Sequence, residues 1–149
     1  MTPSLSPLMT LEVLVAPPVS IDASEHGRRF IPIIGGEVSG QLSGEVLAGG
    51  GDWQTLWPDG RMEISAHYVL EINGHGTVEV RSDGVRHGPP DVLAALARGE
   101  SVDPSLYYFR TAVRLRTAAP GLSHFNGLVA VATGERAADR VRLQVFELG

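Results

Sequence analysis

Residues Arg61–Gly74, RMEISAHYVLEING, decide the fold class of this chain. Apolar and polar side chains alternate from Arg61 to Ile72, which is typical of a β-strand with one face in a core and the other in solvent. The apolar face holds Met62, Ile64, Ala66, Tyr68, Leu70 and Ile72, and the polar face holds Arg61, Glu63, Ser65, His67 and Glu71. Asn73-Gly74 is a favoured hairpin corner, so a second strand is expected to return over residues 77–82.

Most of the remaining chain also has the pattern of short strands separated by glycine and proline. Strands are expected at residues 10–15, 30–34, 37–47, 52–57, 106–117, 125–133 and 140–148, and residues 20–29, which are polar, are expected to form a loop. Turns are predicted at Pro58-Asp59-Gly60 and at Asp83-Gly84. A single helix is expected at Pro90–Arg98, because proline begins it, Asp91 lies in its first turn and Gly99 ends it.

These elements predict an all-β chain. About eight to ten strands and one short helix favour an antiparallel β-barrel, closed or nearly closed, with the helix plugging one end. A β-sandwich is the alternative architecture. Residues 1–149 are expected to form one β-barrel domain, in which residues 1–7, with two prolines and two serines, form a flexible N-terminal arm.

Composition narrows the classes of function. Apolar residues make up 43% of the chain, charged residues 19%, and the net charge is −5, so neither nucleic acid nor a membrane is an expected partner. The chain has no cysteine, and it carries no nucleotide motif or tight histidine cluster, so no cofactor and no metal are expected.

A cytoplasmic location is expected because no signal or membrane-spanning pattern is present. A homo-oligomer, a dimer or larger, is expected because open barrel edges commonly pair.

The first group of candidate site residues lies at the end of the 80–90 segment. Arg86 and His87 directly precede Gly88-Pro89-Pro90, which limits the movement of the backbone. A histidine beside an arginine at a strand end is suited to be a general acid or base. The alternative is a loop histidine that caps backbone carbonyls.

A second group lies in Tyr107–Thr111. Arg110 stands among aromatic residues at the start of a strand, where a guanidinium can bind a carboxylate or phenolate and a tyrosine hydroxyl can orient it. Arg114 and Arg116 lie on the same face and are expected to form a solvated stripe. In the competing interpretation, Arg81, Arg86 and Arg110 are surface ion-pair partners for the 17 acidic residues.

These groups together suggest a pocket at the barrel mouth for a small aromatic or enolisable anion. Arg81, Arg86 and Arg110 are expected to converge on this pocket and to stabilise an enolate or phenolate during cofactor-independent isomerisation, cyclisation or elimination by proton transfer. The predicted catalytic residues are His87, Arg110 and Glu135, and the predicted ligand-binding residues are Trp53, His67, Arg81, Arg86, Tyr108 and Asn126. The alternative function is a non-catalytic carrier of a small ligand, so whether the protein is an enzyme stays open. For His67 the alternative role is an exposed strand residue, and for Trp53 a core residue.

Several sequence blocks occur in a fixed order from about Leu8 to Leu148. They are Gly44-Glu45-Val46-Leu47, Gly50-Gly51-Asp52-Trp53, Pro58-Asp59-Gly60, Gly84–Pro89, Tyr107–Thr111 and Gly134-Glu135-Arg136. Together they resemble the domain of unknown function 3237, also called uncharacterised protein family 0311. The resemblance implies a small lipocalin-like, or calycin-like, β-barrel and no particular activity. This chain departs from that pattern at Ser65 and His67, where an acidic residue and an arginine are common, and at His124-Phe125, where an aromatic residue and a leucine precede the asparagine.

Overall fold

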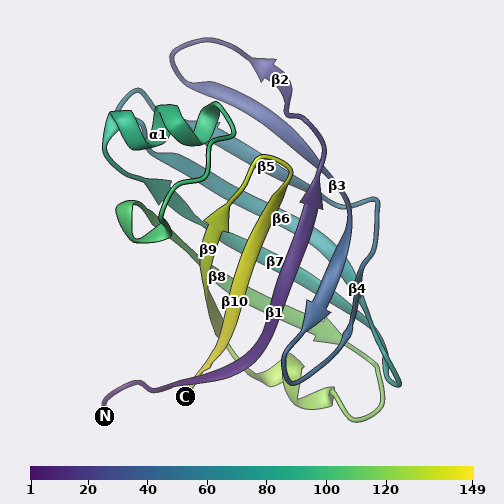
Figure 1. The fold of residues 1–149 in the computed structure, drawn as a ribbon. Helices are drawn as coiled ribbons and strands as arrows, with labels where there is room; N and C mark the ends of the chain where they lie inside the picture. Colours follow the sequence, from purple (N-terminus) through teal and green to yellow (C-terminus); the bar gives the residue numbers. More distant parts are fainter.

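The β-sheet of this protein closes on itself. The computed structural model describes residues 1–149 as an eight-stranded antiparallel barrel with two additional strands and one short helix (Figure 1). The barrel strands are β1 (Leu5–Val15), β3 (Gly27–Ser39), β5 (Gly51–Leu56), β6 (Met62–Ile72), β7 (Gly76–His87), β8 (Tyr108–Thr117), β9 (Ala130–Arg136) and β10 (Arg140–Leu148). Pairing of β3 with β1 completes the ring, which excludes an open sandwich.

The remaining elements lie at the edges and ends of the barrel. Strand β2 (Val19–Asp22) pairs with β3, and β4 (Gly44–Val46) bridges β3 and β6. Helix α1 (Pro90–Ala97) lies at one end of the barrel, and both chain termini lie toward the other end (Figure 1). Two 3-10 turns are η1 (Pro104–Leu106) and η2 (Ser123–Gly127). No helix is long and apolar enough to cross a membrane.

The alternating pattern of residues 61–72 is confirmed. Met62, Ile64, Tyr68, Leu70 and Ile72 are buried, whereas Glu63, Ser65 and His67 are exposed and Glu71 is partly exposed. Strand β6 pairs with β7 in an antiparallel hairpin around Asn73-Gly74, as expected. The helix predicted at residues 90–98 is also present, one residue shorter.

The turn predicted at Asp83-Gly84 was wrong, because β7 runs unbroken from Gly76 to His87. Gly84 faces the barrel interior opposite Thr111, and a Cβ there would stand 2.0 Å from the carbonyl oxygen of Arg110. The glycine therefore permits close approach of two strands. Gly36 has the same role in β3, since its Cβ would stand 1.9 Å from the Glu12 carbonyl oxygen, so the break expected near Gly35-Gly36 does not occur.

Strand limits differ from expectation in several places. The strand expected at residues 37–47 is divided, because β3 ends at Ser39 and β4 covers only Gly44–Val46. The sheet begins at Leu5, which pairs with Leu148, so the last three residues of the expected arm are ordered by β10. Residues 20–29, expected as a loop, include most of β2 and the start of β3. The strand expected from residue 125 begins at Ala130, because Phe125 belongs to η2 and is buried.

The apolar core fills the barrel mainly away from α1. Its most fully buried apolar side chains are Leu11, Leu70, Ile72, Val78, Val80, Val113, Phe125 and Val145. A polar pair appears near the middle, where the Ser82 hydroxyl donates a hydrogen bond to Thr111 Oγ1 at 2.9 Å. Toward α1 the interior side chains become charged, which is unusual for a barrel core.

Candidate functional site

Three arginines occupy the interior of the barrel at the end that α1 covers. Arg29, Arg86 and Arg136 come from β3, β7 and β9. Each continues the inward-facing register of its strand: Arg86 is paired with the buried Met62, Arg29 with the buried Gln54, and Arg136 follows Gly134 by two residues. The closed sheet therefore directs three guanidinium groups from separate strands toward one space.

That space is a cavity of about 570 Å³. Its wall contains the three arginines together with apolar side chains from the strands and from α1, among them Val15, Leu56, Met62, Leu93 and Leu96. Cavities of about 300–1,000 Å³ with mostly apolar walls and a few convergent polar groups are typical of small-molecule sites. The cavity thus has the size and lining to hold a small ligand.

The three guanidinium groups have few partners. None of them lies within 4.0 Å of a carboxylate, although Arg29 Nε donates to Gln54 Oε1 at 2.7 Å. Arg86 Nε and Arg136 Nη1 are buried and bond to nothing. Burial, and then the positive charges of Arg29 and Arg136, lower the pKa of Arg86 to about 10. A guanidinium group stays protonated in proteins, so all three side chains are cationic at neutral pH.

Two carboxylates lie near the arginines. Asp139 lines the cavity and is ion-paired with Arg140, and Asp52 lies on β5, one inward-facing position beyond Gln54. Asp52 accepts hydrogen bonds from Gln54 Nε2 at 2.7 Å and from the Ser65 backbone N–H at 3.2 Å. Burial raises the pKa of Asp52 to about 6, against the lowering effects of these hydrogen bonds and of Arg29 and Arg86. A carboxyl group with this pKa can accept or return a proton near neutral pH.

Two tyrosines complete the polar end of the barrel. Tyr107 Oη accepts a hydrogen bond from the Arg136 backbone N–H at 3.0 Å, which fixes the start of the loop that follows β9. The Tyr68 hydroxyl is fully buried without a partner, and burial raises its pKa well above the usual value, with a further contribution from Asp52. Tyr68 therefore stays protonated, with a buried hydroxyl group from which no group of the chain accepts a hydrogen bond.

Of the residues predicted from the sequence, Arg86 alone faces this cavity. His87, Tyr108 and Arg110 gather instead on the outer face, where His87 stacks on Tyr108 at 5.0 Å and Arg110 lies 5.2 Å from the same ring. Arg110 also donates to the Phe109 carbonyl oxygen at 2.8 Å. Glu135 is exposed on β9. The catalytic roles assigned to His87, Arg110 and Glu135 stay predictions, at a different place from the interior cavity.

The other predicted ligand residues also lie outside the barrel. His67, Arg81 and Asn126 line one groove on the outer face of β6–β8. Asn126 has a structural task there, because its Oδ1 accepts from the Thr117 backbone N–H at 2.8 Å. Trp53 is exposed and packs on Phe30 with ring centroids 4.6 Å apart. The expected convergence of Arg81 with Arg86 does not occur, because residues five apart on one unbroken strand point to opposite faces.

Sequence reasoning missed Arg29, Asp52, Gln54, Arg136 and Tyr107. A usable signal was present in the alternation: Ala130, Ala132, Gly134 and Arg136 share one face of β9, and the first three are buried. A charged residue that continues the buried register at a strand end marks an interior polar site. No three histidine, aspartate or glutamate side chains gather as metal ligands.

Comparisons with known proteins place this chain among uncharacterised relatives. A family model described as "Protein of unknown function (DUF3237)" matches residues 3–148. The chain is similar to a UPF0311 protein of Bradyrhizobium diazoefficiens, with 38% identity over 151 residues and 99% of each chain covered. It is also similar to one of Clostridium acetobutylicum, with 33% identity over 144 residues, 95% of this chain and 91% of that one.

Solved structures show the same barrel. A conserved protein of unknown function from Rhodopseudomonas palustris is 37% identical, with a TM-score of 0.91 and full coverage of both chains. A β-barrel like protein from Acinetobacter baumannii is 34% identical, with a TM-score of 0.85 and coverage of 100% and 98%. An enzyme from Penicillium herquei, at 18% identity, a TM-score of 0.75 and coverage of 100% and 96%, shares the fold alone.

Proposed function

This chain belongs to the DUF3237 family, and we propose that it binds a small aromatic or enolisable anion in the cavity beneath α1 and moves a proton on it without a cofactor. The observation that carries this proposal is the convergence of Arg29, Arg86 and Arg136 on one cavity without a carboxylate partner. Buried charges are costly unless they are paired. An anionic ligand would supply that pairing.

The chemistry of the cavity wall supports an aromatic or similarly flat ligand. A guanidinium binds a carboxylate or enolate through two parallel hydrogen bonds, and three such groups can bind more than one oxygen atom. The apolar side chains of Leu56, Met62 and Leu93 offer a surface for the rest of the molecule. A ligand with a ring and an adjacent acid group matches both parts of the wall.

Proton transfer would use Asp52. Its carboxylate accepts a proton from a carbon atom next to the ligand's carbonyl group, and the electron pair of that C–H bond forms the enolate. The negative charge then rests on an oxygen atom beside the arginines, which stabilise it electrostatically. The carboxylic acid of Asp52 returns the proton to the same or a neighbouring carbon, so no oxidant or other reactant is needed.

A carrier function is the second candidate, because Asp52 is not part of the cavity wall. A carrier needs only the arginines and the apolar surface. The two candidates differ in whether bound ligand exchanges protons with solvent.

The test uses phenylpyruvate, an aromatic anion whose benzylic protons exchange through an enol. In deuterated buffer, NMR would follow the loss of the benzylic proton signal with wild-type protein, with Asp52→Asn and with Asp83→Asn, which makes the same substitution at an exposed position of β7, as the control. We expect faster exchange than in buffer, a loss of about 100-fold or more in Asp52→Asn, and no change in Asp83→Asn. Binding without accelerated exchange would favour the carrier, and equal exchange by both variants would contradict the role of Asp52.

A further inference from the structure

The outer face of the barrel carries a row of four glutamates on neighbouring strands. Glu12 on β1 stands opposite Glu37 on β3, Glu37 opposite Glu45 on β4, and Glu45 opposite Glu71 on β6. We call these four residues the acidic row. Like charges directly opposite one another in a sheet destabilise it. The row therefore carries an energetic cost in the isolated chain.

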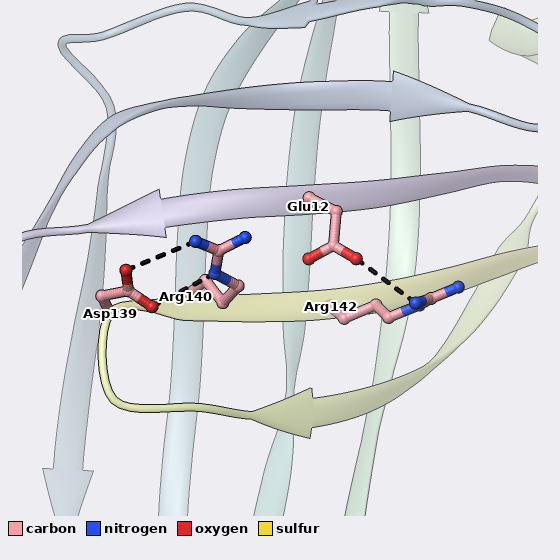
Figure 2. A network of polar contacts seen from close by, with 4 residues as sticks. All are labelled: Glu12, Asp139, Arg140 and Arg142. Carbon is pink, nitrogen blue, oxygen red and sulfur yellow. Dashed lines mark hydrogen bonds and ion pairs between the residues drawn. The ribbon is translucent and has the colours of Figure 1, made fainter. Parts of the chain in front are cut away.

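Little within the chain compensates this cost. Glu12 forms an ion pair with Arg142 of β10 at 3.4 Å, whereas the neighbouring Arg140 is paired with Asp139 (Figure 2). Glu37, Glu45 and Glu71 have no ion-pair partner. The four glutamates lie one to a strand and do not gather as metal ligands. Three carboxylates of the acidic row are thus open to an outside partner.

A basic groove begins where the acidic row ends. Arg81 on β7 stands opposite Arg114 on β8, and neither is ion-paired. Arg116 stands opposite Glu79, whose carboxylate is already bound to His67 at 2.5 Å. Together these side chains line an outer groove of about 1,080 Å³, which we call the basic groove.

The two charged surfaces are adjacent on β6. Val69 lines the basic groove and is 37% exposed, and Glu71 of the acidic row lies two residues further along the same face. An exposed apolar residue therefore lies between a negative and a positive surface. The surface is therefore negative on one side of Val69 and positive on the other. A two-fold rotation about an axis at Val69 would place the negative side of one copy against the positive side of another.

We propose that a second copy of this chain docks on this surface, with a two-fold axis near Val69. Glu45 and Glu71 of each copy then face Arg114 and Arg81 of the other, and the contact occurs twice. A nucleic acid or a strongly acidic partner would match only the groove, and a basic partner only the acidic row. A second copy matches both, relieves repulsion in both, and covers Val69. This inference is independent of the proposed function, because the cavity lies inside the barrel.

Charge-reversal variants test this proposal by sedimentation velocity. Wild-type protein at about 0.1 mM and low ionic strength is expected to be a dimer, since interfaces of ordinary size reach micromolar affinity or better. It should dissociate in about 1 M salt, where the Debye length falls to about 3 Å. Arg114→Glu and Glu45→Arg should each weaken dimerisation by at least about 10-fold, because each places two like-charge pairs in the interface.

The decisive sample is an equimolar mixture of these two variants. In the mixed dimer, Glu45 of one chain meets Arg114 of the other, and the introduced arginine and glutamate meet at the second contact, so dimerisation should return. Arg98→Glu and Glu63→Arg make the same charge changes elsewhere and should leave the dimer unchanged. A monomeric wild-type protein would overturn the proposal, as would variants that stay dimeric or a mixture that stays monomeric.

Discussion

The ring of Phe109 lies against the backbone of Gly134 on the neighbouring strand, so closely that a Cβ on Gly134 would stand 2.6 Å from the ring. This contact lies directly beside the site. Phe109 is paired with Arg86 across β7 and β8, and Gly134 precedes Arg136 by two residues on β9. The glycine thus lets an aromatic ring fill the space between two of the cavity's arginines.

Gly134→Ala is therefore expected to destabilise the protein by about 1–3 kcal/mol, since the added methyl group forces Phe109 out of its packed position. Gly127→Ala is the matched control, because a methyl group at that position would have no neighbouring atom within 4 Å and the backbone there is not left-handed. Urea denaturation of the two variants measures the difference. Equal stability of both would show that Phe109 moves aside without cost.

Asp52→Asn should remove a pH dependence of stability. The folded-state pKa of Asp52, about 6, is raised above the value near 3.9 of an unfolded aspartate, so the folded protein binds more protons between these values. By linkage, the contribution of Asp52 to the free energy of unfolding is greatest below about pH 4. It falls as the pH rises to about 6, and it is constant above that pH. The variant should be more stable than wild type by about 2 kcal/mol near pH 8. Parallel profiles of stability against pH would contradict the assignment.

Asn126→Ala should destabilise the fold and leave ligand binding unchanged. The side chain of Asn126 accepts from the Thr117 backbone N–H and donates to the carbonyl oxygens of Thr117 and Ser123. Losing these exposed contacts is expected to cost about 1–2 kcal/mol. Thermal unfolding with and without salicylate measures both effects. An unchanged midpoint without ligand, together with a lost ligand shift, would favour the ligand-binding role predicted from the sequence.

The sequence predicts those parts of the fold that depend on neighbouring residues, and it fails where a residue's role depends on a distant part of the chain. The alternation of residues 61–72 and the Asn73-Gly74 corner are local signals, and both were sufficient to predict the β6–β7 hairpin. The Asp83-Gly84 pair suggested a wrong turn because glycine serves two purposes: it permits a turn, and it permits close approach of a neighbouring strand. Which purpose applies at Gly84 depends on Arg110, 26 positions away in the sequence.

The candidate site was harder to predict than the fold for a related reason. Arg81, Arg86 and Arg110 were grouped by their proximity in sequence and by nearby turn residues. In the barrel, the face on which a side chain lies is set by strand register, and one extra residue reverses it. Arg29 and Arg136 are 107 positions apart and share no local pattern. Only closure of the sheet brings them to one cavity.

Binding of an anion by the interior arginines is tested most directly by calorimetric titration of salicylate into two matched variants. Arg86→Met removes a buried, unpaired charge, so the fold should be as stable as wild type or more stable, while affinity for salicylate falls by at least about 10-fold. Arg110→Met makes the same substitution on the outer face and should bind salicylate as wild type does. Wild-type affinity in Arg86→Met, with loss of affinity in Arg110→Met, would contradict the interior site.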